Sequence, residues 1–257
     1  MVVATWNVNS IRSRLPRVLA WLQARQPDVL CLQELKTESA LFPYPAFWAL
    51  GYQVALYAEK HWNGVAICSR RPMTDVALGF GDGAPDIDAR LVGATVEGVR
   101  ILSAYVPHGR AVGHEEWSYK LGWLRRLRAH LDARHDPAKP LVLCGDFNVA
   151  PESRDVWAPE KWTGEVHFHP DARVELRGVA AFGLHDTFRM HHAGGGLFSY
   201  WDYKTRDAVE KNRGLRIDHV WATEPLTRRC LFAAIDAGQR LGEHPSDHVP
   251  VLAAFSD

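Results

Sequence analysis

The sequence lacks several motifs that would each assign the protein to a catalytic class. Its 257 residues contain no HExxH, no CxxC and no Cys/His finger spacing, so neither a zinc hydrolase nor a structural zinc site is indicated. They also contain no GxSxG nucleophile elbow and no GxxxxGK[ST] phosphate loop. The sequence therefore gives no support to zinc chemistry, to a serine hydrolase or to a P-loop NTPase.

Cysteine is scarce and long apolar runs are missing. The four cysteines, Cys31, Cys68, Cys144 and Cys230, are widely spaced, and Cys31 and Cys144 lie inside apolar, strand-like runs. This pattern is typical of reduced, buried thiols in a cytoplasmic protein and not of a disulfide framework. No apolar run approaches the roughly 20 residues that span a bilayer, and the first residues do not resemble a signal peptide. We therefore predict a cytoplasmic protein that does not enter membranes.

The chain carries no excess of charge of either sign. Lysine and arginine together number 30, as do aspartate and glutamate, so the formal net charge is zero. A protein that coats a polyanion with its whole surface is usually basic, so indiscriminate coating of nucleic acid is not expected. Two local basic clusters are present: Arg12, Arg14 and Arg17 early in the chain, and Arg206, Lys211, Arg213 and Arg216 late. A solvated surface is the simpler interpretation of either cluster alone, although both are compatible with a local binding face.

Apolar runs bounded by turn residues recur throughout and predict buried strands. They cover residues 2–8, 29–34, 64–69, 91–96, 99–107, 141–148, 216–222 and 248–255. Glu97-Gly98 predicts the turn of a hairpin between two of these strands. Two long helices are predicted, one over 11–25 after the N-cap Ser10 and one over 114–134. Pro16 is expected near position N1 of the first helix, or else to mark a later start.

No repeat, low-complexity tract or long linker divides the chain. Strands and helices are mixed without regular alternation, which favours a single α/β sandwich domain over residues 1–257.

Polar side chains, most of them oxygen-bearing, gather where the predicted strands end or begin. They are Asn7, Asn9, Gln33, Glu34, Asp146, Asn148, Asp218, His219, Asp247 and His248. Each one alone is explained by an Asx turn, a helix cap or a polar loop. Burying so many acids together without a cation would be prohibitive, so the set as a whole predicts a metal site. Carboxylate and amide oxygens favour Mg²⁺, or Mn²⁺, over zinc.

A divalent ion beside carboxylates and one histidine suits transfer of a phosphoryl group to water. The metal neutralises phosphate oxygens, a carboxylate activates the water, and a cationic histidine stabilises developing charge. The other histidines form no recognisable metal-binding or catalytic motif. His167 and His169, like the pair His191 and His192, are expected at the surface.

An ordered set of segments then resembles the exonuclease III family of apurinic/apyrimidinic (AP) endonucleases, within the endonuclease/exonuclease/phosphatase superfamily. The segments are "TWNVNSIR", "LCLQELK", "NGVAI", "YVPHG", "GDFNVAP", "WDYK", "NRGLRIDHVWAT" and "PSDHVPV". "GDFN" alone would mark only the superfamily, whereas "WDY" followed by "GLRIDH" points to its DNA-repair branch. The resemblance runs from about residue 2 to residue 255. It implies a four-layer, DNase I-like α/β sandwich, with two packed mixed sheets flanked by helices and the site at one edge.

The resemblance also implies a ligand set for the metal. Glu34 would be the main ligand, with Asn7 near the same ion or the phosphate. Asp146 and Asn148 would lie close to the ion, and Asp247 would bind a second ion or the DNA. His248 is included in this set because it would contact the scissile phosphate.

Catalytic roles follow from the same resemblance. Asp146 would activate the attacking water or protonate the leaving oxygen, and Asn148 would orient that water or the phosphate. Asp218 would hold His248 in its charged form. Tyr105 would donate a hydrogen bond to the phosphate.

Five further positions would meet the DNA. Arg12 and Arg90 would contact the backbone, and Trp201 would line the pocket for a flipped, baseless sugar. Val209 occupies a position where the family often has a larger wedge, in a loop that looks one residue longer than usual between residues 203 and 212. His108 stands where the family commonly has Asn, and an imidazole there is expected to titrate near neutral pH.

The implied activity is Mg²⁺-dependent hydrolysis of the DNA backbone at abasic sites, or trimming of 3′ ends, in base excision repair. The implied partner is double-stranded DNA with abasic sites or damaged 3′ ends, and the protein would be a monomer associated with the bacterial nucleoid. Two alternatives stay open: a small-molecule or lipid-head-group phosphodiesterase, and a DNA-binding module without catalytic activity.

Overall fold

Two six-stranded sheets pack face to face in the computed structural model, which describes residues 1–256. Sheet A contains, in order, β11 (Cys230–Ile235), β12 (Val251–Phe255), β1 (Val2–Asn7), β2 (Val29–Gln33), β4 (Val65–Ser69) and β3 (Gln53–Tyr57). Sheet B contains β5 (Met73–Leu78), β6 (Leu91–Val96), β7 (Val99–Tyr105), β8 (Leu141–Asp146), β10 (Asp218–Thr223) and β9 (Leu184–Asp186). The predicted α/β sandwich is confirmed.

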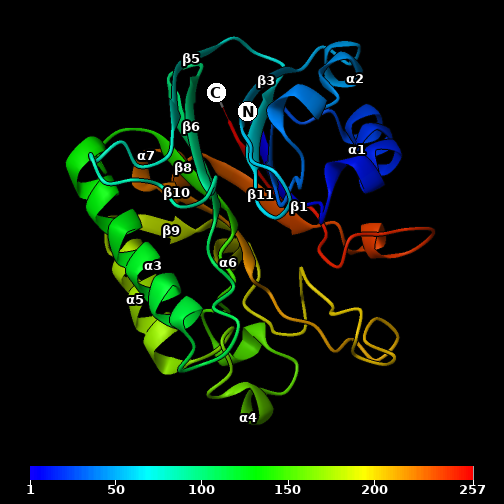
Figure 1. Ribbon diagram of the computed structural model, residues 1–257, viewed down its shortest axis with the longest axis vertical. Helices are drawn as coiled ribbons and strands as arrows, with labels where there is room; N and C mark the ends of the chain where they lie inside the picture. Colours follow the sequence, from blue (N-terminus) through cyan, green and yellow to red (C-terminus); the bar gives the residue numbers. More distant parts are fainter. Residues whose placement is uncertain (257) are drawn as a thin grey trace.

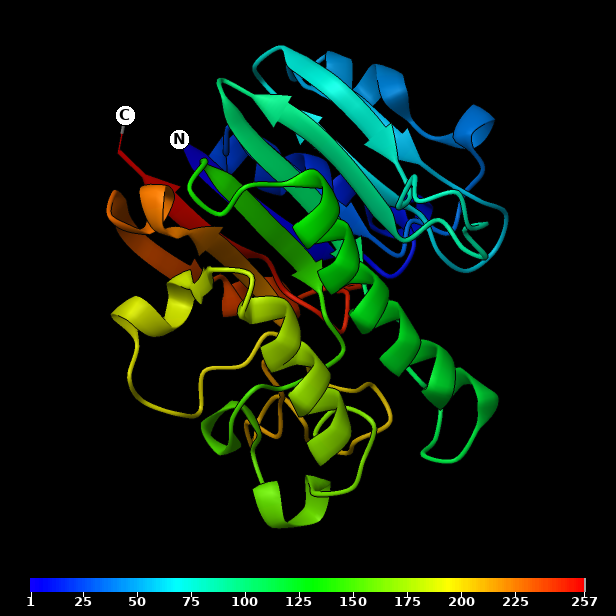
Figure 2. The same ribbon diagram turned by 90° about the vertical axis from the view of Figure 1, so that its left-hand side faces the viewer.

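Helices cover both outer faces of the pair of sheets. They are α1 (Ile11–Arg25), α2 (Tyr44–Trp48), α3 (Glu115–Arg134), α4 (Pro159–Trp162), α5 (Pro170–Ala180), α6 (Thr187–His191) and α7 (Glu224–Thr227). Figure 1 shows α1 on one side of the sheets and α3 with α5 on the other. Figure 2 shows α3 and α5 lying over sheet B. The order of layers is therefore helix, sheet, sheet, helix, and no helix among residues 1–256 has the length and apolarity to cross a bilayer.

The first helix begins where its cap predicts, but Pro16 is not near its start. The Ser10 side chain accepts a hydrogen bond from the Ser13 N–H, and the backbone N–H groups of Ser10 and Ile11 donate to the strand-end carbonyls of residues 34 and 35. These bonds fix the start at Ile11, so Pro16 lies inside the helix. The expected N1 position, or a later start, is wrong. Pro16 is exposed, so water can reach the carbonyl that loses its helical partner.

The strands that sequence patterns missed are the four sheet edges. All eight predicted runs contain a strand, and the hairpin between β6 and β7 turns at Glu97 and Gly98, both with positive φ. The missed strands are β3, β5, β9 and β11, which end the two sheets. An edge strand has one neighbour and little cover, so it carries no continuous apolar run. In β5, for example, Met73 is half-buried and the other five residues are exposed.

Strand direction brings the polar strand ends to one edge of the sandwich. β1 runs parallel to β2 in sheet A, and β7 runs parallel to β8 in sheet B. Asn7 at the end of β1 donates a hydrogen bond to Asp146 at the end of β8, so all four strands end at the same side. β10 is antiparallel to β8 and begins there, with Asp218 opposite Asp146. β12 is antiparallel to β1, so the segment that precedes β12 returns to the same edge.

A buried polar bridge joins the two sheets just below this edge. The Gln33 side chain of sheet A accepts a hydrogen bond from Thr5 at 3.1 Å and donates one to Ser103 of sheet B at 3.1 Å. The side chains below it, such as Cys31 and Cys144, belong to the apolar core between the sheets. The polar strand ends therefore lie directly above the apolar core between the two sheets.

Candidate active site

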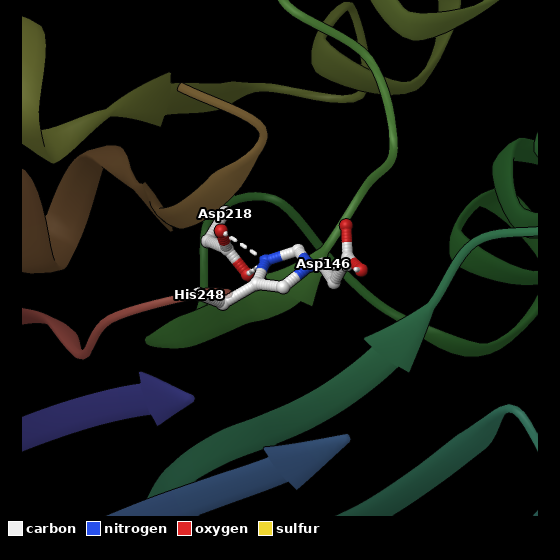
Figure 3. Close-up of side chains that lie close together, drawn as sticks. All are labelled: Asp146, Asp218 and His248. Atoms are coloured by element: carbon white, nitrogen blue, oxygen red, sulfur yellow. Dashed lines mark hydrogen bonds and ion pairs between the residues drawn. The ribbon is translucent and has the colours of Figure 1, made fainter. Parts of the chain in front are cut away.

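Asp146, Asp218 and His248 form a compact, buried cluster at the polar edge. One ligand atom from each lies within 4.8 Å of the others. Figure 3 shows the imidazole between the two carboxylates. Its Nδ1 is 2.8 Å from an Asp218 oxygen, and its Nε2 is 3.8 Å from Asp146 Oδ2. The Ser199 hydroxyl donates to Asp218 at 2.6 Å, so Asp218 is held from both sides.

This geometry favours the charged form of His248. Burial alone lowers the pKa of His248, but the carboxylates of Asp218 and Asp146 outweigh burial and raise that pKa well above its usual value. Conversely, burial raises the pKa of Asp146 although the imidazolium opposes the rise. The site therefore holds a cationic histidine beside a carboxylate that readily accepts a proton.

Asn7, Asn148 and Gly145 place Asp146. Asn7 donates to Asp146 Oδ2 at 2.9 Å, and the backbone N–H of Asn148 donates to Oδ1 at 2.9 Å. A Cβ atom at Gly145 would lie 1.8 Å from the Ala104 carbonyl oxygen, so only glycine lets β8 approach β7 here. This explains why Gly145 interrupts the apolar run before Asp146.

The Tyr105 phenol lies within the electrostatic influence of both Glu34 and Asp146. Desolvation and the carboxylates of Glu34 and Asp146 raise the pKa of Tyr105 well above its usual value, so the phenol stays a hydrogen-bond donor. The Arg90 guanidinium lies 4.7 Å from the centre of the Tyr105 ring and is 2.7 Å from Asp88. Arg90 is 8% exposed, so in this structure it supports Tyr105 from within the protein.

A hydrogen-bonded chain links Glu34 to the other outer carboxylate, Asp247. Lys36 Nζ is 2.9 Å from Glu34 and 2.7 Å from the Asn9 amide oxygen. The Asn9 amide in turn donates to Asp247 at 3.0 Å. The sequence patterns assigned no role to Lys36; the available signal was a basic residue two positions after the strand-end acid Glu34.

His167 is part of the site and not of the surface. It is buried, and its Nε2 is 3.2 Å from Asn148 Oδ1. The expectation that His167 is a surface residue is wrong because its loop folds under the strand ends, where Ala150 N–H donates to the His167 carbonyl. His169 instead caps α5, and His191 is exposed. Only tertiary contacts distinguish these histidines.

His108 is placed beside His167, with the two ring centres 4.7 Å apart. Its Nδ1 accepts a hydrogen bond from the Arg110 N–H at 3.0 Å, which a second ring proton would break. Although part of the residue is exposed, desolvation of the ring and the nearby Lys120 charge lower the pKa of His108 to about 4. The expected titration near neutral pH is therefore wrong.

We predict that His108→Asn leaves the shape of the pH–rate profile unchanged between about pH 6 and 9. A pKa lowered to about 4 means that the imidazole is already neutral throughout this range and gains a proton only below it. The profile is measured as cleavage rate against pH for wild type and variant under identical salt. A limb that disappears in the variant would contradict the prediction.

The other expected DNA-contacting residues lie around this edge at different depths. Arg12 is exposed on the first turn of α1. Trp201 is 5% exposed and donates to Asn212 at 3.2 Å, so it is a buried aromatic under its loop. Val209 is half-buried and packs against the cluster that contains Trp201 and Phe198. Arg216, assigned by sequence to a basic surface cluster, is fully buried.

Comparisons with known proteins identify the family of this chain. The model of the Endonuclease/Exonuclease/phosphatase family matches residues 4–248. Exodeoxyribonuclease III of Haemophilus influenzae is 31% identical, with 99% of this chain and 100% of that protein covered. The solved AP endonuclease of Archaeoglobus fulgidus is 41% identical with a TM-score of 0.97, and the 3′ phosphatase NExo from Neisseria, bound to a product DNA hairpin, is 35% identical with a TM-score of 0.95; each covers 100% of both chains. The chain therefore belongs to the Endonuclease/Exonuclease/phosphatase family, in its exonuclease III and AP endonuclease branch.

Proposed function

We propose that the protein is a Mg²⁺-dependent DNA-repair phosphodiesterase that cleaves the backbone at abasic sites and trims damaged 3′ ends. The observation that carries the proposal is the imidazolium of His248, held by Asp218 and facing the proton-accepting carboxylate of Asp146. Relatives named exodeoxyribonuclease III, AP endonuclease and 3′ phosphatase support DNA as the substrate.

The chemistry of the donor set fits a hard divalent cation. Glu34, Asp146 and Asp247 supply carboxylates at one edge. Asn7 and Asn148 direct amide N–H groups at Asp146 and so hold that carboxylate in place. When bound there, Mg²⁺ or Mn²⁺ would neutralise phosphate oxygens and increase the acidity of water. His248 is a poorer ligand than these oxygens, because its charged ring has no free lone pair.

The protein side chains around the cation would carry out the proton transfer and stabilise the phosphate. Asp146 accepts a proton from the attacking water as the water oxygen bonds to phosphorus, and it returns that proton to the leaving oxygen as the scissile P–O bond breaks. His248 stabilises negative charge on the phosphoryl oxygens. Tyr105 donates its phenol proton in a hydrogen bond to the same phosphate. Asp218 keeps His248 charged and correctly turned, and Asn148 orients the water or the phosphate.

DNA would cross the edge that carries these groups. Arg12 would contact a backbone phosphate, His108 would donate from its neutral ring, and the loop over Trp201 and Val209 would line the pocket for the damaged sugar. Phosphate contacts dominate such binding, so affinity should fall steeply with salt. The protein would act on DNA as a monomer with one catalytic domain, in the cytoplasm beside the nucleoid.

Chelation tests this function directly. A labelled duplex with one abasic analogue, and a second with a 3′-phosphate, should be processed with Mg²⁺ and left intact with EDTA. Added Mg²⁺ should restore activity, since the acidic edge repels a phosphodiester without the cation.

Two outcomes would contradict the proposal. Binding of either duplex without cleavage in Mg²⁺ or Mn²⁺ would indicate a DNA-binding module. Hydrolysis of small phosphodiesters that an excess of duplex DNA fails to inhibit would indicate a different substrate class.

A further inference from the structure

Lys120 is a fully buried cation near the start of α3. Within residues 1–256 its ammonium contacts carbonyl oxygens instead of carboxylates: it donates to His108 at 3.0 Å, to Asn148 at 2.7 Å and to Val166 at 2.8 Å. Burial lowers the pKa of Lys120 to about 7, and the Asp146 carboxylate acts in the opposite direction. Only an ammonium group has three N–H donors, so the charged form satisfies all three carbonyls together.

The three carbonyls belong to three separate loops of the active site. His108 follows β7, Asn148 follows β8, and Val166 immediately precedes His167. The side chains of these loops contact one another, since His167 bonds the Asn148 amide and packs against the His108 ring. One buried group thus ties together, from below, the loops whose side chains meet at the site.

Gly109 shows that the fold is built around the Lys120 side chain. A Cβ atom at position 109 would lie 2.9 Å from Lys120 Cδ and 3.3 Å from the Trp117 ring. Gly109 also has φ +89, a conformation that glycine adopts without strain. The backbone therefore closes over the lysine stem at the only side-chain-free residue of "YVPHG".

Asn148 needs support of this kind. Its φ of 50° is in the left-handed region, which costs a non-glycine residue free energy unless its surroundings hold it there. Its backbone N–H and its amide are held by Asp146 and Val106, and its carbonyl is held by Lys120. Without Lys120 the buried carbonyl loses its donor, and the loop is free to relax.

We propose that Lys120 is a positioning residue for phosphodiester hydrolysis, acting through the main chain of Asn148 to set the amide of Asn148 against Asp146. This rests on the proposed function for its effect on rate. Lys120 makes no contact with the DNA in this scheme, because it lies beneath the loops.

Kinetics of Lys120→Met, which keeps the apolar stem and removes the donors, test the rate effect. Because a displacement of about 1 Å can cost about 10²-fold, we expect a loss of that order in the single-turnover rate, with DNA affinity little changed. Lys120→Arg should recover part of the rate. The matched control is Leu127→Ala, on the buried face of the same helix but in the core over sheet B: its melting temperature should fall while its rate stays near that of wild type.

A double-mutant cycle tests the route through Asn148. If Lys120 acts through that residue, Lys120→Met should reduce the rate by no more than about 3-fold in an Asn148→Ala background, against about 10²-fold in wild type. Equal factors in both backgrounds, or a wild-type rate in Lys120→Met at a temperature where it is folded, would overturn the proposal.

A measurement without DNA separates this proposal from the proposed function. The side-chain amide signals of Asn148 in ¹H–¹⁵N NMR should shift and exchange faster with water in Lys120→Met but not in Leu127→Ala. Signals in Lys120→Met identical to those of wild type would overturn the positioning role, whatever the activity. Failure of the wild-type protein to cut DNA would refute the proposed function alone.

Discussion

Replacing Asp146 with asparagine should reduce the cleavage rate of an abasic-site duplex on the order of 10³-fold. Asparagine has the same shape but cannot accept a proton from water. The change also removes one of the three carboxylates that favour the charged form of His248, so stabilisation of the phosphate weakens as well. Single-turnover cleavage in Mg²⁺, with DNA affinity measured separately, checks the prediction.

The matched control is Asp132→Asn. Asp132 is an exposed acid on α3 that pairs with Arg128, one turn away. Its replacement should leave cleavage within about 2-fold, since exposed helix pairs contribute little. Cleavage by Asp146→Asn at the rate of this control would remove Asp146 from the mechanism.

Replacing Arg216 with methionine should destabilise the fold by about 3–5 kcal/mol, because it removes one partner from a buried ion cluster. Arg216 is fully buried, bonds Asp155 at 2.6 Å and lies 2.7 Å from Asp186. Arg189 also pairs with Asp155, but Asp186 would lose its buried cation. Urea-induced unfolding of both proteins measures the difference.

The effect of Arg216→Met should depend on pH with a defined sign. Although burial raises their pKa values, nearby guanidinium groups lower the pKa of both Asp155 and Asp186 below the usual value. Their stabilising contribution is therefore present above about pH 4, the pKa of an unfolded Asp, and is lost as pH falls below it. The stability gap between wild type and variant should shrink in acid.

Arg228→Met is the control for charge removal as such. Arg228 pairs with Glu224 on the surface, where both side chains are mostly exposed. Its loss should change stability by less than about 0.5 kcal/mol. A similarly small change for Arg216→Met would show that the buried cluster does not stabilise the protein.

The strand ends of the site could be predicted from sequence because their meeting depends on sheet topology alone. Asn7 ends β1 in sheet A and Asp146 ends β8 in sheet B, and each strand has a parallel neighbour that ends at the same edge of its sheet. Packing of the two sheets then brings the two edges together. Asp218 and His248 precede or begin strands that run the opposite way. Alternation within a strand then turns the side chains toward the space between the sheets.

The supporting residues could not be predicted in this way. Lys120 occupies a helix whose charged pattern is that of a surface, and Arg216 lies among basic residues that are exposed, such as Arg206. His167 stands in a loop without periodicity. Their burial is decided by how distant loops close over them, which neither composition nor spacing encodes.

The bridge between Gln33 and Ser103 has a mechanical consequence for catalysis. Half of the groups of the site project from sheet A and half from sheet B. An apolar core alone would resist separation of the two sheets far better than it would resist sliding of one sheet over the other. The hydrogen bond from Gln33 to Ser103, at the edge of this core, fixes the position of one sheet relative to the other. A shift of one residue along the strand, about 3.3 Å, would break this bond and separate the groups of sheet A from those of sheet B. The relative alignment of the two sheets therefore sets the distances between the reacting groups, before any loop contributes.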